Sequence, residues 1–256
     1  MEFIDTQIIS YKFKNNRELF DGDIKGRQIS SIVALEFLGI MMKNENKAKM
    51  YPIKLKGFHS SMPFILEHRK KGFELGRKST DKLIIDFNNE FDSIVIYSNE
   101  AISYLINQKD IDALLLFAKS ALDKDEFKRF RERAQFLIDN EITVVPVTQE
   151  IVIRMQCIYE DIKNEYNVKD NYRNSFMDLL ILATAIEKKE MLISKDNELN
   201  KALIKCCEYL NISTNINGIS SIEYCYKPIE KVVKNDNKGY INNSWRIIIQ
   251  KGKICK

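Results

Sequence analysis

The sequence is poor in several features, and each scarcity excludes a class of protein. Its 256 residues include only 9 Gly and 4 Pro, too few for a collagen-like chain, while 45% are hydrophobic, too many for a disordered one. The five cysteines form no CxxC pair, no apolar run approaches the roughly 18 residues that cross a bilayer, and the first residues lack the basic and apolar regions of a secretion signal. We therefore expect a globular, cytoplasmic protein with reduced cysteines and no membrane segment.

Motifs for several kinds of catalysis are also missing. The two histidines, His59 and His68, lie nine residues apart in a segment broken by Gly and Pro, where we expect surface residues rather than a metal pair or a general base. They support no serine or cysteine nucleophile. The glycine-rich motifs that cradle nucleotide phosphates do not occur, so nucleotide-driven functions have no support.

Charge is distributed unevenly along the chain, although the net charge is only +4. Residues 41–80 contain ten Lys or Arg and three acids, and residues 220–256 contain eight and three. The rest of the chain is therefore acidic. This distribution suits a protein that grips a polyanion with its basic segments and gathers acids at a site. Solvated faces of a lysine-rich chain explain the charge equally well.

Strands and helices alternate in the predicted secondary structure, which favours a parallel sheet between helices. We expect strands at 2–5, 142–147, 191–194 and near 212–214, and a buried helix over 29–42 with a Ser30 or Ser31 N-cap. Further helices are expected from Thr148 to about 166, over 175–189 and over 197–210. Between 80 and 140 the apolar spacing is helical, with N-caps at Ser98, Asp110 and Asp123, although 93–97 could instead be a strand.

Acidic residues stand at four places where a ligand site of such a sheet would form. Asp5 and Asp196 follow predicted strands, and ligands bind beyond the carboxyl ends of parallel strands. Asp178 is expected in the first turn of a helix. Each of these three could simply cap or favour a helix N-terminus. Glu36 has no such role, because it lies within an apolar helix, and either a lysine such as Lys195 or a cation shared with the other acids would offset its burial.

These acidic blocks resemble those of the PIN-domain nuclease family. The blocks read FIDT at 3–6, SSIVALEFL at 30–38 and DLLILATAIEKKEMLISKD at 178–196, in the family's order. The resemblance covers about 1–42 and 140–215. It implies a three-layer α/β/α domain with a central parallel sheet, and metal-dependent cleavage of RNA, less often of DNA.

The resemblance also implies which residues form the site. The matching catalytic and metal-binding acids are Asp5, Glu36, Asp178 and Asp196, with Glu198 as an additional metal ligand. Ser194 and Thr6 match hydroxyl residues of the family, whereas Gln7 replaces its usual Asn and Glu198 its usual Asp. Carboxylate oxygens are hard ligands that favour Mg²⁺ or Mn²⁺ over Zn²⁺, and such ions can activate water for phosphodiester hydrolysis.

The resemblance further predicts how the chain is divided. We expect a PIN-like domain over 1–219, with its core at about 1–42 and 140–219 and a mainly helical insertion at about 43–139, followed by a basic extension over 220–256. Aromatic residues alternate with basic ones in the first basic segment, which suits single-stranded RNA. Its candidate nucleic-acid-binding residues are Lys54, Lys56, Arg69, Lys70, Lys71, Arg77 and Lys78.

The leading functional hypothesis is a Mg²⁺- or Mn²⁺-dependent endoribonuclease, and the family resemblance suggests a role as a toxin or defence effector. Its expected partners are an RNA substrate and either an inhibitory protein or further copies of the chain. One alternative is a catalytically silent PIN-like module that binds RNA or a protein partner. Another is a phosphate-accepting receiver domain, which accounts poorly for Glu36 inside a helix.

Overall fold

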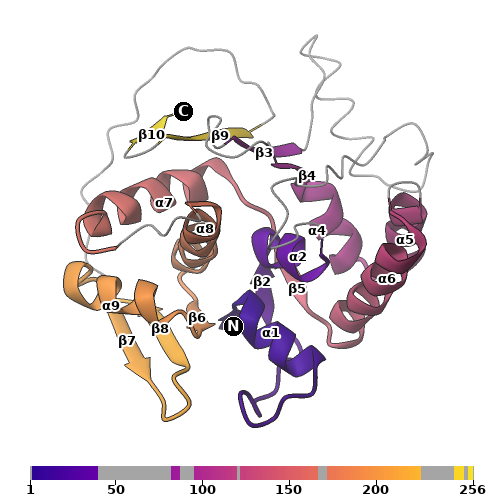
Figure 1. Cartoon of the computed structure of the whole chain (residues 1–256), viewed down its shortest axis with the longest axis horizontal. Coiled ribbons are helices and arrows are strands. Elements are labelled where there is room, and N and C mark those ends of the chain that lie inside the picture. The colour runs from indigo at the N-terminus through magenta and orange to yellow at the C-terminus, as the bar shows by residue number, and fades with distance from the viewer. Residues whose placement is uncertain are drawn as a thin grey trace.

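The computed structural model describes residues 2–39, 82–86, 95–119, 122–166, 172–225, 245–250 and 253–255 (Figure 1). Both histidines lie outside these ranges. So does every predicted nucleic-acid-binding residue, namely Lys54, Lys56, Arg69, Lys70, Lys71, Arg77 and Lys78.

The central sheet has six strands in the order β5-β2-β1-β6-β8-β7. The strands are β1 (Glu2–Ile4), β2 (Gln28–Ser30), β5 (Thr143–Val145), β6 (Met191–Ser194), β7 (Leu210–Thr214) and β8 (Ser220–Tyr224). β5, β2, β1 and β6 run parallel, whereas β8 is antiparallel to both β6 and β7. The mixed α/β fold with a mostly parallel central sheet is therefore confirmed.

Eight helices are found in the described part of the chain. They are α1 (Thr6–Phe13), α2 (Ser31–Phe37), α4 (Asn99–Asn107), α5 (Ile111–Lys119), α6 (Lys124–Asp139), α7 (Gln149–Ile162), α8 (Tyr172–Lys188) and α9 (Asn197–Cys206). α8 packs on β2, β6 and α7, while α4, α5 and α6 contact one another on another side of the molecule (Figure 1). The arrangement is consistent with the α/β/α layers expected from the resemblance.

Local sequence explains where several helices begin. Asp123 and Glu126 form a reciprocal capping box at the start of α6, Thr148 caps α7, and the Asp110 carboxylate accepts a 3.0 Å hydrogen bond from the Ala113 amide in α5. These N-caps were predicted from the sequence and are confirmed. β5, with the pattern TVV, is likewise the short parallel strand that its β-branched residues predicted.

Several predicted elements were wrong in type or extent. Ile29 belongs to β2, and the helix expected over 29–42 ends at Phe37, after which Gly39 adopts a positive φ of 75°. Leu83 lies in β3 (Lys82–Asp86), although the apolar spacing predicted a helix there, because helical spacing over a short stretch cannot exclude a short strand. The alternative strand at 93–97 is confirmed in position by β4 (Val95–Ser98).

A second sheet was not predicted at all. It has the order β10-β9-β3-β4 and pairs β3 with β9 (Trp245–Gln250) in parallel, while β10 (Lys253–Cys255) and β4 run antiparallel to their neighbours. In addition, β8 lies within 220–256 yet pairs with β6 in the central sheet. The C-terminal residues thus contribute strands to both sheets. The division into core, insertion and extension stays a prediction.

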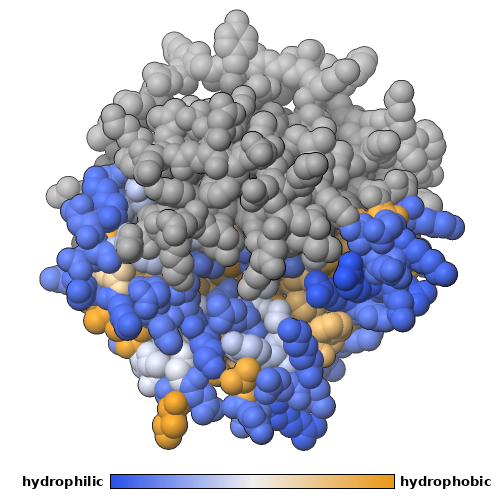
Figure 2. All heavy atoms as spheres, viewed as in Figure 1, coloured by the Kyte–Doolittle hydropathy of each residue, from blue (hydrophilic) through white to orange (hydrophobic). Residues whose placement is uncertain are grey.

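Buried side chains form one continuous core around the central sheet. Phe13 meets Phe37 and Phe136 edge-on at 5.5 and 5.2 Å between ring centroids, which joins α1, α2 and α6. In the described part of the chain, no helix is long and apolar enough to span a bilayer. Figure 2 shows a mainly hydrophilic face over the described residues, with separate apolar spots.

Candidate metal centre

Asp5 is placed by the end of β1 and the beginning of α1. Its backbone N–H donates to the Ile193 carbonyl at 3.0 Å, which continues the β1–β6 ladder, and its carboxylate caps α1 by accepting from the Thr6 amide. The remaining carboxylate oxygen, Oδ2, accepts a 2.8 Å hydrogen bond from the Ser194 hydroxyl. Only 5% of Asp5 is exposed. The ends of the parallel strands β1 and β6 therefore hold the Asp5 carboxylate buried and oriented at the expected edge of the sheet.

Glu36 reaches the same region from α2. The other residues of this helix between Ser31 and Phe37 are buried, whereas Glu36 is half-buried. Its Oε2 accepts a hydrogen bond from the Thr6 hydroxyl. The sequence suggested Lys195 as a partner, but the Lys195 ammonium lies 5.4 Å from the centroid of the Tyr11 ring. Thr6 directly follows Asp5, so Asp5 contacts the end of β6 while Thr6 contacts Glu36 in α2.

Asp196 lies two residues beyond the end of β6. Its backbone N–H donates to the Ser194 hydroxyl oxygen at 3.2 Å, and its Oδ1 caps α9 by accepting from the amides of Glu198 and Leu199, both at 3.0 Å. The Ser194 hydroxyl therefore connects the loop that carries Asp196 to the Asp5 carboxylate. The helix-capping role expected for Asp196 is confirmed, and it coexists with a place beside the other acids.

Asp178 projects from α8, which starts at Tyr172 rather than at Ser175. It therefore stands in the second helical turn and not in the first, so the helix-terminus explanation for this acid was wrong. Burial raises the pKa of Asp178 well above its usual value, and the negative charges of Asp5, Glu36 and Asp196 raise it further, as does a side-chain hydrogen bond with Asp196. Four acids that are distant in sequence thus act on one another in the fold.

Glu198 is placed differently from these four. It lies in the first turn of α9 with its side chain 62% exposed, and its carboxylate is 3.4 Å from the Lys201 ammonium. It is absent from the charges that raise the pKa of Asp178. Its position as a metal ligand is therefore the least supported of the predicted set.

The donor chemistry of the four-carboxylate group, Asp5, Glu36, Asp178 and Asp196, fits a hard divalent cation. The pKa of Asp178 is raised by its burial among three other carboxylates, and a bound cation would offset their mutual repulsion. Among the described residues, however, no three His, Cys, Asp or Glu side chains already stand in a metal-binding arrangement. The residues are of the right type and in one place, but they are not held in a closed coordination shell.

Sequence reasoning missed two further residues beside this group. The side chains of Tyr166 and Ser175 are buried, and burial raises the pKa of Tyr166, which a side-chain hydrogen bond with Ser175 lowers and the charges of Asp178, Asp196 and Glu198 raise further. Tyr166 was expected only as the end of a helix, and Ser175 only as the start of another. Both lie in stretches without a motif, so no sequence signal could have identified them.

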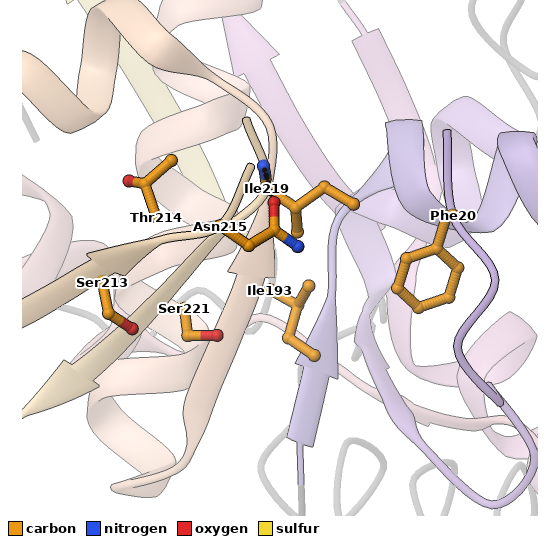
Figure 3. Close-up of a pocket in the computed structure, with 7 residues that line it drawn as sticks. All are labelled: Phe20, Ile193, Ser213, Thr214, Asn215, Ile219 and Ser221. Atoms are coloured by element: carbon orange, nitrogen blue, oxygen red, sulfur yellow. Dashed lines mark hydrogen bonds between the residues drawn. The ribbon is translucent and has the colours of Figure 1, made fainter. Parts of the chain in front are cut away.

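A separate pocket of about 400 Å³ opens beside β6, β7 and β8. Figure 3 shows Phe20 on one side and Ser213, Asn215 and Ser221 on the other, with Ile193 between them. Ile193 precedes Ser194, and successive strand residues point to opposite faces of a sheet. The pocket is therefore on the face away from the Ser194–Asp5 hydrogen bond, and none of its lining residues is ionisable.

Comparison with known protein families finds a match over part of this chain. Residues 111–203 match the family model described as the PIN domain. The matched range includes Asp178, Asp196 and Glu198, starts within the predicted insertion, and leaves Asp5 and Glu36 outside it. No curated protein and no solved structure shows significant similarity to the chain. Proteins with this domain are in general nucleases, typically use divalent metal ions and generally act on RNA. The match over residues 111–203 supports the assignment to the PIN-domain nuclease family.

Proposed function

We propose that this protein is a Mg²⁺- or Mn²⁺-dependent endoribonuclease in which Asp5, Glu36, Asp178 and Asp196 hold the metal. The observation that carries the proposal is the electrostatic coupling of Asp178 to the other three acids, which come from β1, α2 and the loop after β6. Three of them are positioned by hydrogen bonds to hydroxyl or amide groups, so their placement is built into the fold.

A bound divalent cation would lower the pKa of a coordinated water and stabilise the leaving oxygen of a phosphodiester. The protein's own part is orientation. Ser194 fixes Asp5, Thr6 fixes Glu36, and the start of α9 fixes Asp196. Pre-positioned carboxylates reduce the reorganisation needed to bind metal and substrate.

Cleavage of RNA tests this proposal. Purified protein is incubated with labelled single-stranded RNA in Mg²⁺, in Mn²⁺ and in EDTA, beside the variants Asp5→Asn and Asp178→Asn. We expect metal-dependent cleavage that both variants lose while their circular dichroism stays native. Full activity in both variants would overturn the assignment of the site. Growth arrest on expression, absent for Asp5→Asn, would support a toxin or defence role.

A second candidate function is supported by one observation. Because no three described carboxylates stand ready to bind a metal, the chain could be a catalytically silent PIN-like module that binds RNA or a protein partner. Titration with Mn²⁺ separates the two. A protein that binds RNA but neither binds Mn²⁺ nor cleaves RNA in any divalent metal would favour the silent module.

A further inference from the structure

A lysine without an acidic partner lies in the loop between β6 and α9. Lys195 stands between Ser194 and Asp196, which both belong to the candidate metal centre. It is half-buried, its ammonium lies 5.4 Å from the centroid of the Tyr11 ring, and among the described residues it forms no ion pair and no hydrogen bond. An aromatic face attracts an ammonium without neutralising its charge. A full positive charge in the loop that carries Asp196 is therefore available to an anion.

The Lys195 side chain lies at the edge of the separate pocket beside β6, β7 and β8. A Cβ at Gly218 would lie 3.9 Å from Lys195 Cε, so the lysine stem passes close to the turn between β7 and β8. That turn lines the pocket with Asn215 and Ile219, and so does Ile193, two residues before Lys195. One neighbour of Lys195 in sequence and one in space thus border the same pocket.

The pairing of the three strands determines the chemistry of the pocket. Ile193 lies opposite Ser221, and Ser221 lies opposite Ser213, so these side chains form a row on one face of the sheet. Figure 3 shows this row with Asn215 beside it and the Phe20 ring at its other end. Hydroxyl and amide groups donate and accept hydrogen bonds, and the ring offers a flat apolar face. The volume of about 400 Å³ is in the range of small-molecule sites.

A cation at the edge of a neutral, hydrogen-bonding pocket suits a nucleotide. A phosphate binds a positive charge, ribose hydroxyls and base edges bind donors and acceptors, and a base can lie against an aromatic ring. No residue that lines the pocket is ionisable, so the pocket itself neither attracts nor repels charge. Since Lys195 is joined to the candidate metal centre through Ser194 and Asp196, a strand cleaved at that centre passes close to it.

We propose that Lys195 and this pocket form a subsite for a nucleotide next to the cleaved bond. The Lys195 ammonium binds the phosphate of that nucleotide, the Tyr11 ring positions the ammonium, and the pocket takes the ribose and the base. The inference rests on the proposed nuclease function and deepens it, because the four acids act on the cleaved phosphate whereas this subsite holds a neighbouring one. Lys195 takes no part in the chemical step.

Binding of labelled RNA tests the phosphate contact separately from cleavage. Lys195→Gln and Lys195→Arg are made in the Asp5→Asn background, which keeps the strand intact, and dissociation constants for a single-stranded RNA are measured by fluorescence anisotropy in Mn²⁺ at several salt concentrations. We expect Lys195→Gln to weaken binding about tenfold. The slope of log Kd against log salt should fall by about 0.7, the share of one phosphate contact on a single strand. Lys195→Arg keeps the charge and should keep both values.

The matched control for the charge is Lys25→Gln. Lys25 is an exposed lysine, and its ammonium lies 3.5 Å from the Glu141 carboxylate before the first residues of β2 and β5, at the opposite edge of the sheet from the acids. Its replacement should leave the dissociation constant unchanged. A loss of affinity in Lys25→Gln equal to that in Lys195→Gln would show that any lysine contributes, and would overturn the specific contact.

Ser213→Leu tests the pocket, because it fills the space without changing the charge. It should weaken RNA binding on the order of tenfold, as expected for the loss of one stacked nucleotide, and leave the salt slope unchanged. Asn211→Leu is the matched control. Asn211 is an exposed residue two positions earlier on the same face of β7, but it does not line the pocket. Its replacement should leave affinity unchanged, and thermal unfolding verifies that each variant is folded.

The outcomes separate this inference from the proposed function. Unchanged affinity in both Lys195→Gln and Ser213→Leu, while the wild type cleaves RNA, would overturn the subsite alone. A loss in Lys195→Gln without one in Ser213→Leu would support the phosphate contact and overturn the assignment of the pocket. Weaker binding in both variants without any cleavage by the wild type would support the subsite and overturn the nuclease. If the parent binds no RNA and the wild type cleaves none, both fail.

Discussion

The Ser194 hydroxyl donates a 2.8 Å hydrogen bond to Oδ2 of Asp5, across 189 positions of sequence. The same hydroxyl oxygen accepts from the Asp196 amide at 3.2 Å. One small side chain at the end of β6 therefore fixes the relative positions of two acids. It can do so because β1 and β6 run parallel, with Ile4 opposite Ile193, so that both strands end at one edge.

Replacing this hydroxyl should weaken the site. Ser194→Ala leaves the buried Asp5 without one partner and is expected to reduce Mn²⁺ affinity about tenfold, in the range found for groups that orient metal ligands. Isothermal titration with Mn²⁺ measures the effect. Ser220→Ala is the matched control, because Ser220 is a buried hydroxyl that pairs with Asn200 and Thr214 instead. An equal loss of affinity in both variants would contradict the role of Ser194.

Thr6 provides a test at the neighbouring acid. Thr6→Val keeps the shape of the side chain but removes the hydroxyl that donates to Glu36, so we expect slower RNA cleavage by roughly tenfold. Thr6→Ser restores the donor and should recover most of the rate. The readout is the single-turnover cleavage rate at saturating Mg²⁺. Equal rates for the Val and Ser variants would show that the hydrogen bond has no influence on Glu36.

The raised pKa of Asp178 predicts a pH-dependent stability in the absence of divalent metal. Since the folded pKa lies above the unfolded one, the native state binds more protons, and stability falls as pH rises from about 4 through the folded pKa. Asp178→Asn should therefore raise the unfolding temperature at pH 7 in EDTA and flatten this dependence. The measurement is thermal unfolding between pH 4 and 8.

The control for Asp178→Asn is Asp21→Asn, which changes an exposed acid outside the four-carboxylate group and should leave the unfolding temperature unchanged. A lower unfolding temperature for Asp178→Asn at pH 7 in EDTA would contradict the unfavourable electrostatics at this position. Addition of Mn²⁺ should stabilise the wild type more than Asp178→Asn, because only the intact group binds the cation tightly.

A buried polar network supports the helix that carries Glu36. The Asn99 amide accepts from the Ser31 hydroxyl and from the Val147 amide at 3.0 Å, and donates to the Val147 carbonyl at 2.9 Å. Asn99→Leu should lower the free energy of unfolding by about 2–4 kcal/mol, because it leaves several buried partners unpaired. Urea unfolding measures this, with Asn107→Leu as the comparison: it removes a less buried pairing with Val144. Equal losses in the two variants would contradict the special role of Asn99.

The sequence predicted the parts of the fold that depend on local patterns. Capping residues such as Asp123 and Thr148 act on their own helices, and β1, β5 and β6 have the short apolar patterns of buried parallel strands. The second sheet pairs β3 with β9, which are separated by more than 150 residues. Such pairing leaves no periodic signal in either strand, so it could not be predicted.

The candidate site likewise contains residues that local sequence patterns predicted and residues that they could not predict. Asp5, Glu36, Asp178 and Asp196 could be predicted because acids that follow strands or interrupt apolar helices stand out in a sequence. The hydrogen bond from Thr6 to Glu36 could not be predicted, because which side chain reaches Glu36 depends on side-chain directions after folding. Tyr166 and Ser175 become notable only once their burial and their place beside the acids are known.

The central claim is that these four carboxylates bind a divalent cation together. Titration of Mn²⁺ into the metal-free protein, followed by electron paramagnetic resonance of the free ion, tests it most directly. The account predicts saturable binding by the wild type that is at least tenfold weaker in Asp5→Asn and in Asp178→Asn, and unchanged in Asp21→Asn. Binding of equal affinity in all four proteins, or none in the wild type, would contradict it.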